Sequence, residues 1–236
     1  MTRELVYGRR PVHEALSGPR EVLELWAGER AVRSAAWLQD VERPRVQTKL
    51  ERDLSEAAGT RDHQGVVAWC EPFRYADAFE LAAGSAPLLA CLDQVSDPRN
   101  LGAVIRSAEG AGATGVVVPA HGAARVTAAV CRSSAGAVEH LPVAVVPNLA
   151  RYLAEVKSGE LWITGAVGES GTPMWNADLS GGIAFVFGAE GKGLRPLVRR
   201  TCDLEVSIPQ LGHVESLNVS VAAALLLYEA RRQRDL

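Results

Sequence analysis

Residues 183–194 read IAFVFGAEGKGL, five apolar residues followed by three glycines within six positions. A continuous apolar run of this length predicts a strand that is buried on both faces. Glycine allows the chain to turn tightly and allows its backbone to come close to a ligand. The spacing G-x-x-G-x-G is neither the dinucleotide fingerprint nor a phosphate-binding P-loop. The stretch therefore predicts a buried strand that ends in a ligand-binding turn, with an ordinary glycine-rich turn as the alternative.

Strands and helices alternate on both sides of this stretch, from about residue 86 onward. The predicted strands cover residues 88–92, 115–118, 143–146, 161–167, 183–187 and 204–208. The predicted helices cover about residues 101–112, 126–138, 148–157 and 217–232. Apolar strands that alternate with helices are typical of a mainly parallel sheet covered on both faces. In such a sheet, ligands bind outside the carboxyl ends of the strands.

The first part of the chain has a different character. Residues 1–73 are rich in charge and predict a small α/β unit of their own. Its expected strands are residues 22–26 and 66–70, its expected helices are residues 11–17 and 33–39, and residues 43–61 are left unassigned. Prolines and small residues indicate a connector with a short helix inside it. We therefore divide the chain into residues 1–73, a linker at 74–86 and a main domain at 87–236.

Composition excludes several classes of protein. The chain has 236 residues, with 25 Lys and Arg against 28 Asp and Glu, and a net charge of −3. An apolar content of 47% excludes dominant disorder, and the charge excludes a polybasic nucleic-acid binder. The four cysteines form no C-x-x-C pair, so neither zinc nor a disulfide framework is expected. Because no apolar stretch could span a bilayer and no signal peptide is visible, we expect a soluble, cytoplasmic protein.

Two further segments follow predicted strands. Residues 93–106 read DQVSDPRNLGAVIR, in which Asp97 or Asn100 can cap a helix and Pro98 suits its first turn. Arg106 then faces away from the core, and the alternative is a capped helix with a solvated arginine. Residues 208–220 read IPQLGHVESLNVS, with Ser216 placed to cap the last helix. Polar side chains such as Asn218 in an apolar helix usually have another task, although simple capping would also explain them.

Taken together, the three segments resemble the motifs of the SpoU-type RNA ribose 2′-O-methyltransferases, the TrmH family of the SPOUT class. The pattern N-x-G-x-x-x-R matches Asn100, Gly102 and Arg106, F-G-x-E-G-x-G-L matches residues 187–194, and I-P-x-x-G-x-x-x-S-L-N-V-S-x-A matches residues 208–222. The resemblance covers residues 86–236. Near the start, YGRRPVHEAL at residues 7–16 and HQGVVA at residues 63–68 resemble the substrate-binding domain of the branch that methylates guanosines of 23S rRNA.

The resemblance implies a parallel sheet with a C-terminal trefoil knot, S-adenosylmethionine (AdoMet) as methyl donor without a metal, and a homodimer formed through the knot domain. It implies catalytic roles for Arg106, Asn100, Glu190, Ser216 and Asn218. It implies donor contacts from Gly188, Ile208, Leu217, Gly191 and Ser216. The cationic side chains that could meet RNA include Arg9, Arg10, Arg61, Arg99, Arg132, Lys192 and Arg195, although solvated surface is the alternative for each.

The role of Arg106 stays open at this point. The family assigns proton removal to this arginine, but a free guanidinium is essentially never deprotonated near neutral pH. Arg106 could instead pair with an RNA phosphate and stabilise developing negative charge. Glu190 and Asn100 would orient Arg106 or the ribose, and Asn218 would hold the loop or the substrate.

The expected function is methylation of a ribose 2′-hydroxyl, of a guanosine in 23S rRNA. The alternatives within the class are a tRNA ribose methyltransferase and a resistance-type rRNA methyltransferase. A non-enzymatic RNA-binding assembly module would predict damaged motifs, whereas Asn100, Arg106, Glu190, Ser216 and Asn218 are all present. A nicotinamide-dependent oxidoreductase would need the dinucleotide fingerprint, which is absent.

Overall fold

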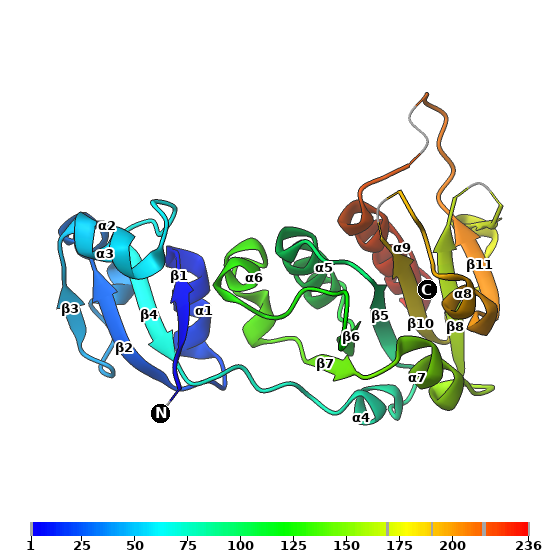
Figure 1. The fold of residues 1–236 in the computed structure, drawn as a ribbon, viewed down its shortest axis with the longest axis horizontal. Coiled ribbons are helices and arrows are strands. Elements are labelled where there is room, and N and C mark those ends of the chain that lie inside the picture. Colours follow the sequence, from blue (N-terminus) through cyan, green and yellow to red (C-terminus); the bar gives the residue numbers. More distant parts are fainter. Residues whose placement is uncertain (1, 169, 190, 214–215, 236) are drawn as a thin grey trace. The chain divides into compact units, whose positions relative to one another are not determined.

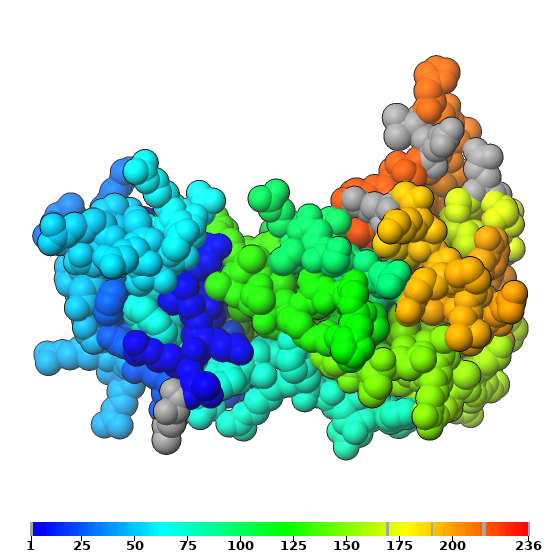
Figure 2. All heavy atoms as spheres, in the orientation of Figure 1, coloured from blue at the N-terminus to red at the C-terminus, as the bar shows by residue number. Residues whose placement is uncertain are grey.

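The computed structural model describes residues 2–168, 170–189, 191–213 and 216–235, which form two compact units (Figures 1 and 2). The first unit comprises the chain up to Arg74 together with Arg125–His140, and the second comprises Tyr75–Ala124 together with the chain from Leu141 onward. The sequence-based division follows chain order and places residues 125–140 in the later domain. In the structure this segment packs with the first unit.

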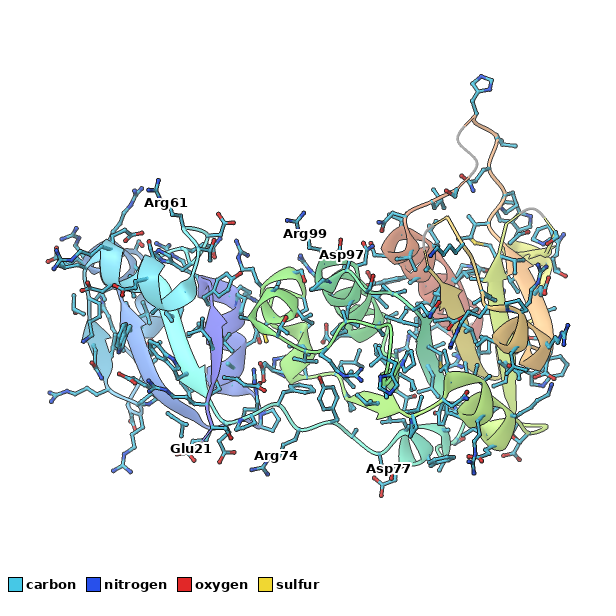
Figure 3. All side chains as sticks on the ribbon, in the orientation of Figure 1. Glu21, Arg61, Arg74, Asp77, Asp97 and Arg99 are labelled. Atoms are coloured by element: carbon cyan, nitrogen blue, oxygen red, sulfur yellow. The ribbon has the colours of Figure 1, made fainter. Side chains whose placement is uncertain are left out.

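The first unit is a mixed four-stranded sheet with helices. Its strands are β1 (Glu4–Tyr7), β2 (Val22–Ala27), β3 (Val46–Thr48) and β4 (Val66–Cys70). Its helices are α1 (Arg9–Ser17), α2 (Glu29–Ser34), η1 (Ala36–Leu38), α3 (Glu51–Ala58), α6 (Ala128–Ser133) and η2 (Ala137–Glu139). The strand order is β1-β4-β2-β3, antiparallel except for the β2/β3 pair. Arg61 extends from the loop between α3 and β4 (Figure 3).

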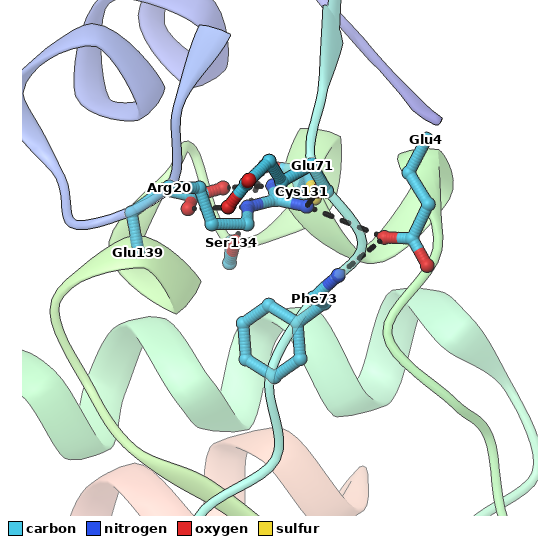
Figure 4. Close-up of polar contacts among 7 residues, drawn as sticks. All are labelled: Glu4, Arg20, Glu71, Phe73, Cys131, Ser134 and Glu139. Carbon is cyan, nitrogen blue, oxygen red and sulfur yellow. Dashed lines mark hydrogen bonds and ion pairs between the residues drawn. The ribbon is translucent and has the colours of Figure 1, made fainter. Parts of the chain in front are cut away.

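A buried ion pair joins residues 125–140 to the rest of the first unit (Figure 4). The Arg20 Nε donates to Glu139 at 2.9 Å, and a second guanidinium nitrogen pairs with the same carboxylate. Arg20 also donates to Glu4 at 3.3 Å. Burial opposes the charge of Arg20, but the bonds to Glu139 outweigh it and raise the pKa of Arg20 above its ordinary value. The pair therefore holds Glu139, and with it the segment, against the first sheet.

The second unit is built on a seven-stranded sheet. Its strands are β5 (Leu88–Asp93), β6 (Gly115–Pro119), β7 (Val143–Val146), β8 (Leu161–Val167), β9 (Thr172–Pro173), β10 (Gly182–Gly188) and β11 (Leu204–Ser207). Its helices are α4 (Ala78–Ala82), α5 (Pro98–Gly110), α7 (Leu149–Val156), η3 (Met174–Asn176), α8 (Pro196–Thr201) and α9 (Val219–Arg234). The order is β7-β6-β5-β10-β8-β11-β9, and every pairing given for these strands is parallel. The predicted α/β class with a mainly parallel sheet is confirmed.

The order in which the chain adds strands to the sheet reverses between β5 and β10. The chain runs outward from β5 to β6 and β7 on one side, whereas β10 and β8 lie on the other side. The last residues of the two central strands, Asp93 and Gly188, are register partners. An open α/β sheet binds ligands at such a switch point. Side chains from α4, α7 and α8 pack in the core on one face of the sheet, and α5 packs against α9, which also contacts β10 (Figure 1).

Several element boundaries differ from the sequence-based expectation. The last helix begins at Val219 and is capped by Asn218 rather than Ser216, because the Asn218 carboxamide oxygen accepts from the Ser220 backbone N–H at 2.9 Å. The helix expected over residues 126–138 is two short helices, because Gly136 between them has a positive φ of 90°. The cap at Asp97 is confirmed, since its carboxylate accepts from the Arg99 N–H at 2.8 Å. The C-terminal knot stays a prediction.

Two expectations from composition concern membranes and cysteines. In the part of the chain that the structure describes, no helix is long and apolar enough to cross a membrane. All four cysteines are free thiols. Burial raises the pKa of Cys70 and Cys202 to about 11 and that of Cys131 to about 12. These thiols are protonated at neutral pH and are therefore poor nucleophiles.

Candidate active site

The glycine-rich turn at the end of β10 depends on the absence of side chains. A Cβ on Gly188 would lie 2.2 Å from the carbonyl carbon of Gly193, so the two backbone segments touch. The Ala189 carbonyl accepts from the Gly193 N–H at 2.9 Å and closes the turn. Gly191 and Gly193 have positive φ angles of 72° and 64°. The glycines in this stretch are therefore a geometric requirement of the turn. Glu190 lies outside the described residues.

A buried carboxylate fixes the far end of this turn. Asp93 is fully buried at the end of β5, and it accepts from the Arg195 backbone N–H at 2.8 Å and from Arg195 Nε at 2.7 Å. The interaction joins the turn to the neighbouring strand at the switch point. Arg195, which the sequence offers as an RNA contact, is engaged here instead. The sequence feature that could have predicted this role is Asp93 itself, a single acidic residue at the end of an otherwise apolar strand.

A cavity of about 450 Å³ lies between this turn, the end of β8 and the segment that leads into α9. All five residues expected to contact the donor line it: Gly188, Gly191, Ile208, Ser216 and Leu217. Apolar side chains of Phe187, Leu194 and Leu226 form much of the remaining wall. Pockets of 300–1,000 Å³ with apolar walls are typical of sites for small ligands and cofactors. The structure thus gathers the predicted donor residues around one cavity of suitable size.

The described residues that line this donor cavity include few charged side chains. Among its described lining residues, only Lys192 and Arg199 are charged, and none is His, Asp, Glu, Cys or Tyr. Arg199 is paired with Glu205 at 2.5 Å, and this hydrogen bond raises the pKa of Arg199 and lowers that of Glu205. No wall residue described here is therefore an ordinary general base. Such a cavity suits a ligand that is already activated.

A second cavity, of about 460 Å³, adjoins the first and shares Ala189, Lys192 and Val219 with it. Asn100 lines it at the start of α5. The Asn218 carboxamide nitrogen donates to the Asn100 carboxamide oxygen at 3.0 Å, which links the start of α5 to the start of α9. The two predicted asparagines are therefore in direct contact although 118 positions separate them in the sequence.

Arg106 and the cationic side chains predicted to contact RNA do not gather at one site. Arg106 is exposed on α5 and lines neither cavity. Lys192 is exposed and lines both cavities, and Arg99 projects beside Asp97 at the start of α5 (Figure 3). In the first unit, Arg9 and Arg61 line a separate pocket.

The two remaining predicted cations, also in the first unit, are engaged within it. Arg10 pairs with Glu14 at 2.7 Å. The stem of Arg132 packs against Gly8, where an added Cβ would lie 3.1 Å from the Arg132 Cδ.

Sequence reasoning missed one wall of the donor cavity. Residues 166–168 at the end of β8 and Ser170 line it, and Ser170 Oγ accepts from Arg199 at 3.3 Å. A glycine directly after a predicted strand, here Gly168, was the available signal. For metals, the described residues contain no group of three or more His, Cys, Asp or Glu side chains that could hold an ion.

A parallel sheet with a backbone-lined cavity at its switch point is typical of enzymes that bind nucleotides or nucleoside-containing cofactors. Comparison with known families makes the class specific. The model of the SpoU rRNA Methylase family matches residues 87–228, and the model for RNA 2′-O ribose methyltransferase substrate binding matches residues 5–76. The chain belongs to the SpoU rRNA methylase family, whose members transfer methyl groups from AdoMet to RNA ribose.

Two of the relatives compared cover nearly the whole chain, and a third covers about two thirds of it. A 23S rRNA (guanosine-2′-O-)-methyltransferase of Shewanella oneidensis is 38% identical, over 98% of this chain and 98% of the relative. The SpoU methyltransferase AviRb of Streptomyces viridochromogenes, solved with AdoMet, is 29% identical with a TM-score of 0.83, over 99% of this chain and 91% of that one. A TrmH/SpoU tRNA-modifying enzyme of A. aeolicus is 25% identical with a TM-score of 0.57, and it covers 66% of this chain and 80% of its own.

Proposed function

We propose that this chain transfers the methyl group of AdoMet to the ribose 2′-hydroxyl of a guanosine in 23S rRNA. The observation that carries the proposal is the convergence of Gly188, Gly191, Ile208, Ser216 and Leu217 on one cavity at the sheet's switch point. Similarity to a 23S rRNA guanosine methyltransferase along 98% of the chain supports the choice of RNA. Residues 1–73 would bind the RNA, residues 74–86 would link the two domains, and residues 87–236 would catalyse methyl transfer. The reaction would take place in the cytoplasm.

The residues around the donor cavity fit AdoMet. Apolar walls can enclose an adenine and a methionine chain, and the bare backbone of the glycine turn lets the ligand lie against main-chain groups. Bound AdoMet supplies a methyl group that is already activated by its sulfonium sulfur. The 2′-oxygen forms a bond to the methyl carbon while the carbon–sulfur bond breaks with its electron pair left on sulfur, and the hydroxyl proton passes to solvent. Positioning and charge stabilisation are then the main tasks of the protein.

Arg106 would act as an electrostatic stabiliser rather than as a base. An arginine side chain does not act as a base in proteins, and Arg106 is exposed on α5. An exposed guanidinium can pair with an RNA phosphate or with the developing negative charge on the 2′-oxygen. Asn218 and Asn100, joined at 3.0 Å, would hold the entrance segments in place beside Ser216. Glu190 keeps its proposed role in orienting Arg106 or the ribose.

We also propose that two copies pair through the second unit. Helix α9 exposes an apolar stripe of Val221, Leu225 and Tyr228, which are 46%, 39% and 52% exposed. Their i, i+4, i+7 spacing places them on one side of the helix, opposite to the buried Ala223 and Leu227. A second copy of this stripe is a suitable cover for it. The expected result is a dimer in sedimentation experiments and a monomer for Leu225→Glu.

A tRNA substrate is the second candidate. The tRNA-modifying structure matches 66% of this chain, whereas the 23S rRNA relative extends along 98%. This difference favours large-subunit rRNA. A resistance-type rRNA methyltransferase would share the same chemistry and differ only in its target nucleotide.

The test is methyl transfer from labelled AdoMet to separated, unmodified tRNA, small-subunit rRNA and large-subunit rRNA, with assembly precursors run in parallel. Label in alkali-resistant dinucleotides of large-subunit rRNA is the expected result. Label in tRNA alone would overturn the substrate and keep the chemistry. Absence of both label and donor binding would overturn the enzymatic function.

A further inference from the structure

The arginines of the first unit differ in their partners. Six of the thirteen pair with a carboxylate: Arg3 with Glu24, Arg10 with Glu14, Arg20 with Glu139, Arg33 with Glu29, Arg52 with Asp53 and Arg74 with Glu71. Among the arginines for which the described residues show no ion pair, Arg9, Arg30 and Arg61 are set apart because all three line the same pocket. Cations that repel one another and lack carboxylates indicate a place where an anion binds.

This arginine pocket has a volume of about 370 Å³, which is enough for one nucleotide. It is formed by the starts of α1, α2 and α3 and by the loop before β4. Its lining residues are Arg9, Gly28, Arg30, Ala31, Glu51, Arg61, Gln64 and Gly65. Three guanidinium groups face a single carboxylate, so the net charge of the pocket is positive.

The loop that carries Arg61 is held in a defined shape. Gln64 has a positive φ of 53°, an unusual conformation for a residue with a side chain. Its carboxamide oxygen accepts from the Arg9 backbone N–H at 3.1 Å, and its carbonyl oxygen accepts from Arg9 Nε at 3.2 Å. Arg9 is thereby positioned at the pocket with its terminal nitrogens still available to a ligand. Backbone strain of this kind is often kept at binding sites.

His63 supports the same loop from inside. It is fully buried, its Nδ1 accepts from the Gly65 N–H at 3.0 Å, and its Nε2 lies 3.0 Å from Ser55 Oγ. Because Nδ1 accepts, Nε2 carries the hydrogen and donates to Ser55. His63, the first residue of the family-like segment at 63–68, therefore has a structural role: it fixes the loop at the edge of the pocket.

We propose that this pocket binds one nucleotide of the RNA substrate, with its phosphodiester held by Arg9, Arg30 and Arg61. A guanidinium presents paired N–H donors that match the oxygens of a phosphate. Glu51, 3.5 Å from His63 Nε2, offers an acceptor to ribose or base donors and disfavours ligands that are only anionic. The inference rests on the proposed function, because RNA is the substrate there, and it assigns a defined site within the first unit to that RNA.

The test compares Arg30→Ala, Arg61→Ala and the double variant with two matched controls. Arg33→Ala removes an exposed arginine from the same helix as Arg30, and Arg52→Ala removes one from α3, but both of these arginines are paired with carboxylates. The full-length enzyme is titrated with large-subunit rRNA over a range of salt concentrations, and methyl transfer and AdoMet binding are measured beside it. Melting temperatures verify that the exposed substitutions leave the fold intact.

Each single pocket variant is expected to weaken RNA affinity about fivefold and to reduce the salt dependence by about one ion. The KM for RNA should rise while kcat and AdoMet affinity stay the same, and Arg30→Lys should recover part of the loss. Pocket variants that match Arg33→Ala and Arg52→Ala in affinity and salt dependence would overturn the site. If the wild type methylates no RNA but the pocket variants still lose RNA affinity relative to the controls, the proposed function is wrong. The proposal that the arginine pocket binds RNA is then still supported.

Discussion

The donor cavity of the second unit and the arginine pocket of the first unit are of similar size but have opposite chemistry. The donor cavity has glycine backbone and apolar walls, with Lys192 and Arg199 as its only charged side chains among the described residues. The arginine pocket has three guanidinium groups, and Gly28, Ala31 and Gly65 are its described lining residues without a polar side chain. The first arrangement suits a compact ligand held closely by the main chain, and the second suits a polyanion.

This difference predicts how each site responds to mutation. Where backbone segments touch, a single added methyl group is enough to disturb the site, and no neighbour can compensate. Where binding depends on charges at an exposed surface, each arginine contributes a modest and nearly independent part. The donor cavity should therefore fail at a single substitution, whereas the arginine pocket should weaken in steps.

The largest effect is expected at Arg20, which stabilises the first unit without lining either site. Arg20→Ala leaves Glu139, only 5% exposed, without its cation, and the free energy of unfolding should fall by about 3–5 kcal/mol. Denaturant unfolding measures the loss. Arg74→Ala is the control, because its ion pair with Glu71 is exposed and should contribute only about 0–1 kcal/mol. Equal losses in the two variants would contradict a stabilising role for the buried pair.

Arg106→Ala should have the next largest effect, and it should act on turnover alone. The loss of one charge-stabilising group lowers kcat by about 10²–10³. AdoMet binding, followed by calorimetry, should be unchanged because Arg106 does not line the donor cavity. Arg151→Ala, on the exposed side of α7, is the control and should keep full turnover. Near-normal turnover of both Arg106→Ala and Arg106→Lys would remove Arg106 from the mechanism.

Gly188→Ala tests whether the glycine-rich turn shapes the donor cavity. The new Cβ would lie 2.2 Å from the Gly193 carbonyl carbon, so the turn must open at a cost of about 1–3 kcal/mol. AdoMet affinity should fall by roughly one to two orders of magnitude in calorimetry. Gly159→Ala, where no atom lies within 4 Å of the added Cβ, should bind normally. An unchanged affinity of Gly188→Ala would show that the turn does not shape the donor site.

The smallest effect is expected at Asn218, where two substitutions separate two tasks. Asn218→Asp keeps the oxygen that caps α9 but loses the amide that donates to Asn100. Asn218→Ala loses both and should be less stable than Asn218→Asp by about 1 kcal/mol in thermal unfolding. Both variants should turn over more slowly than wild type. Full activity of Asn218→Asp would mean that the contact with Asn100 has no part in catalysis.

The sequence allowed prediction of much of the second unit. Its strands are apolar on both faces, so runs such as residues 143–146 and 161–167 coincide with the observed strands. The donor residues were predicted from the resemblance of residues 187–194 and 208–222 to the motifs of the family. The cap of α9 was placed wrongly at Ser216, since Ser216 and Asn218 are both good capping residues and only the tertiary contact with Asn100 distinguishes them.

The first unit was harder to predict for a physical reason. Helix α3 and strand β3 lie in the polar stretch that was left unassigned, because each is short and only Leu54 of α3 is buried. Arg9 and Arg61 were recognised as cations, but Arg30 and Gln64 were not, because their pocket forms only when four separate segments meet. The same holds for residues 125–140, which join the first unit through the buried Arg20–Glu139 pair, the contact of His140 with Glu14 at 2.8 Å and the packing of α6 against β1.

The central claim is that donor binding and RNA binding belong to different, separately breakable sites. The most direct measurement gives both affinities, for AdoMet and for large-subunit rRNA, in Gly188→Ala and in the Arg30→Ala/Arg61→Ala double variant. The account predicts that Gly188→Ala loses AdoMet affinity and keeps RNA affinity, and that the double variant does the reverse. Loss of both affinities in each variant, or loss of AdoMet affinity in the arginine variant alone, would contradict it.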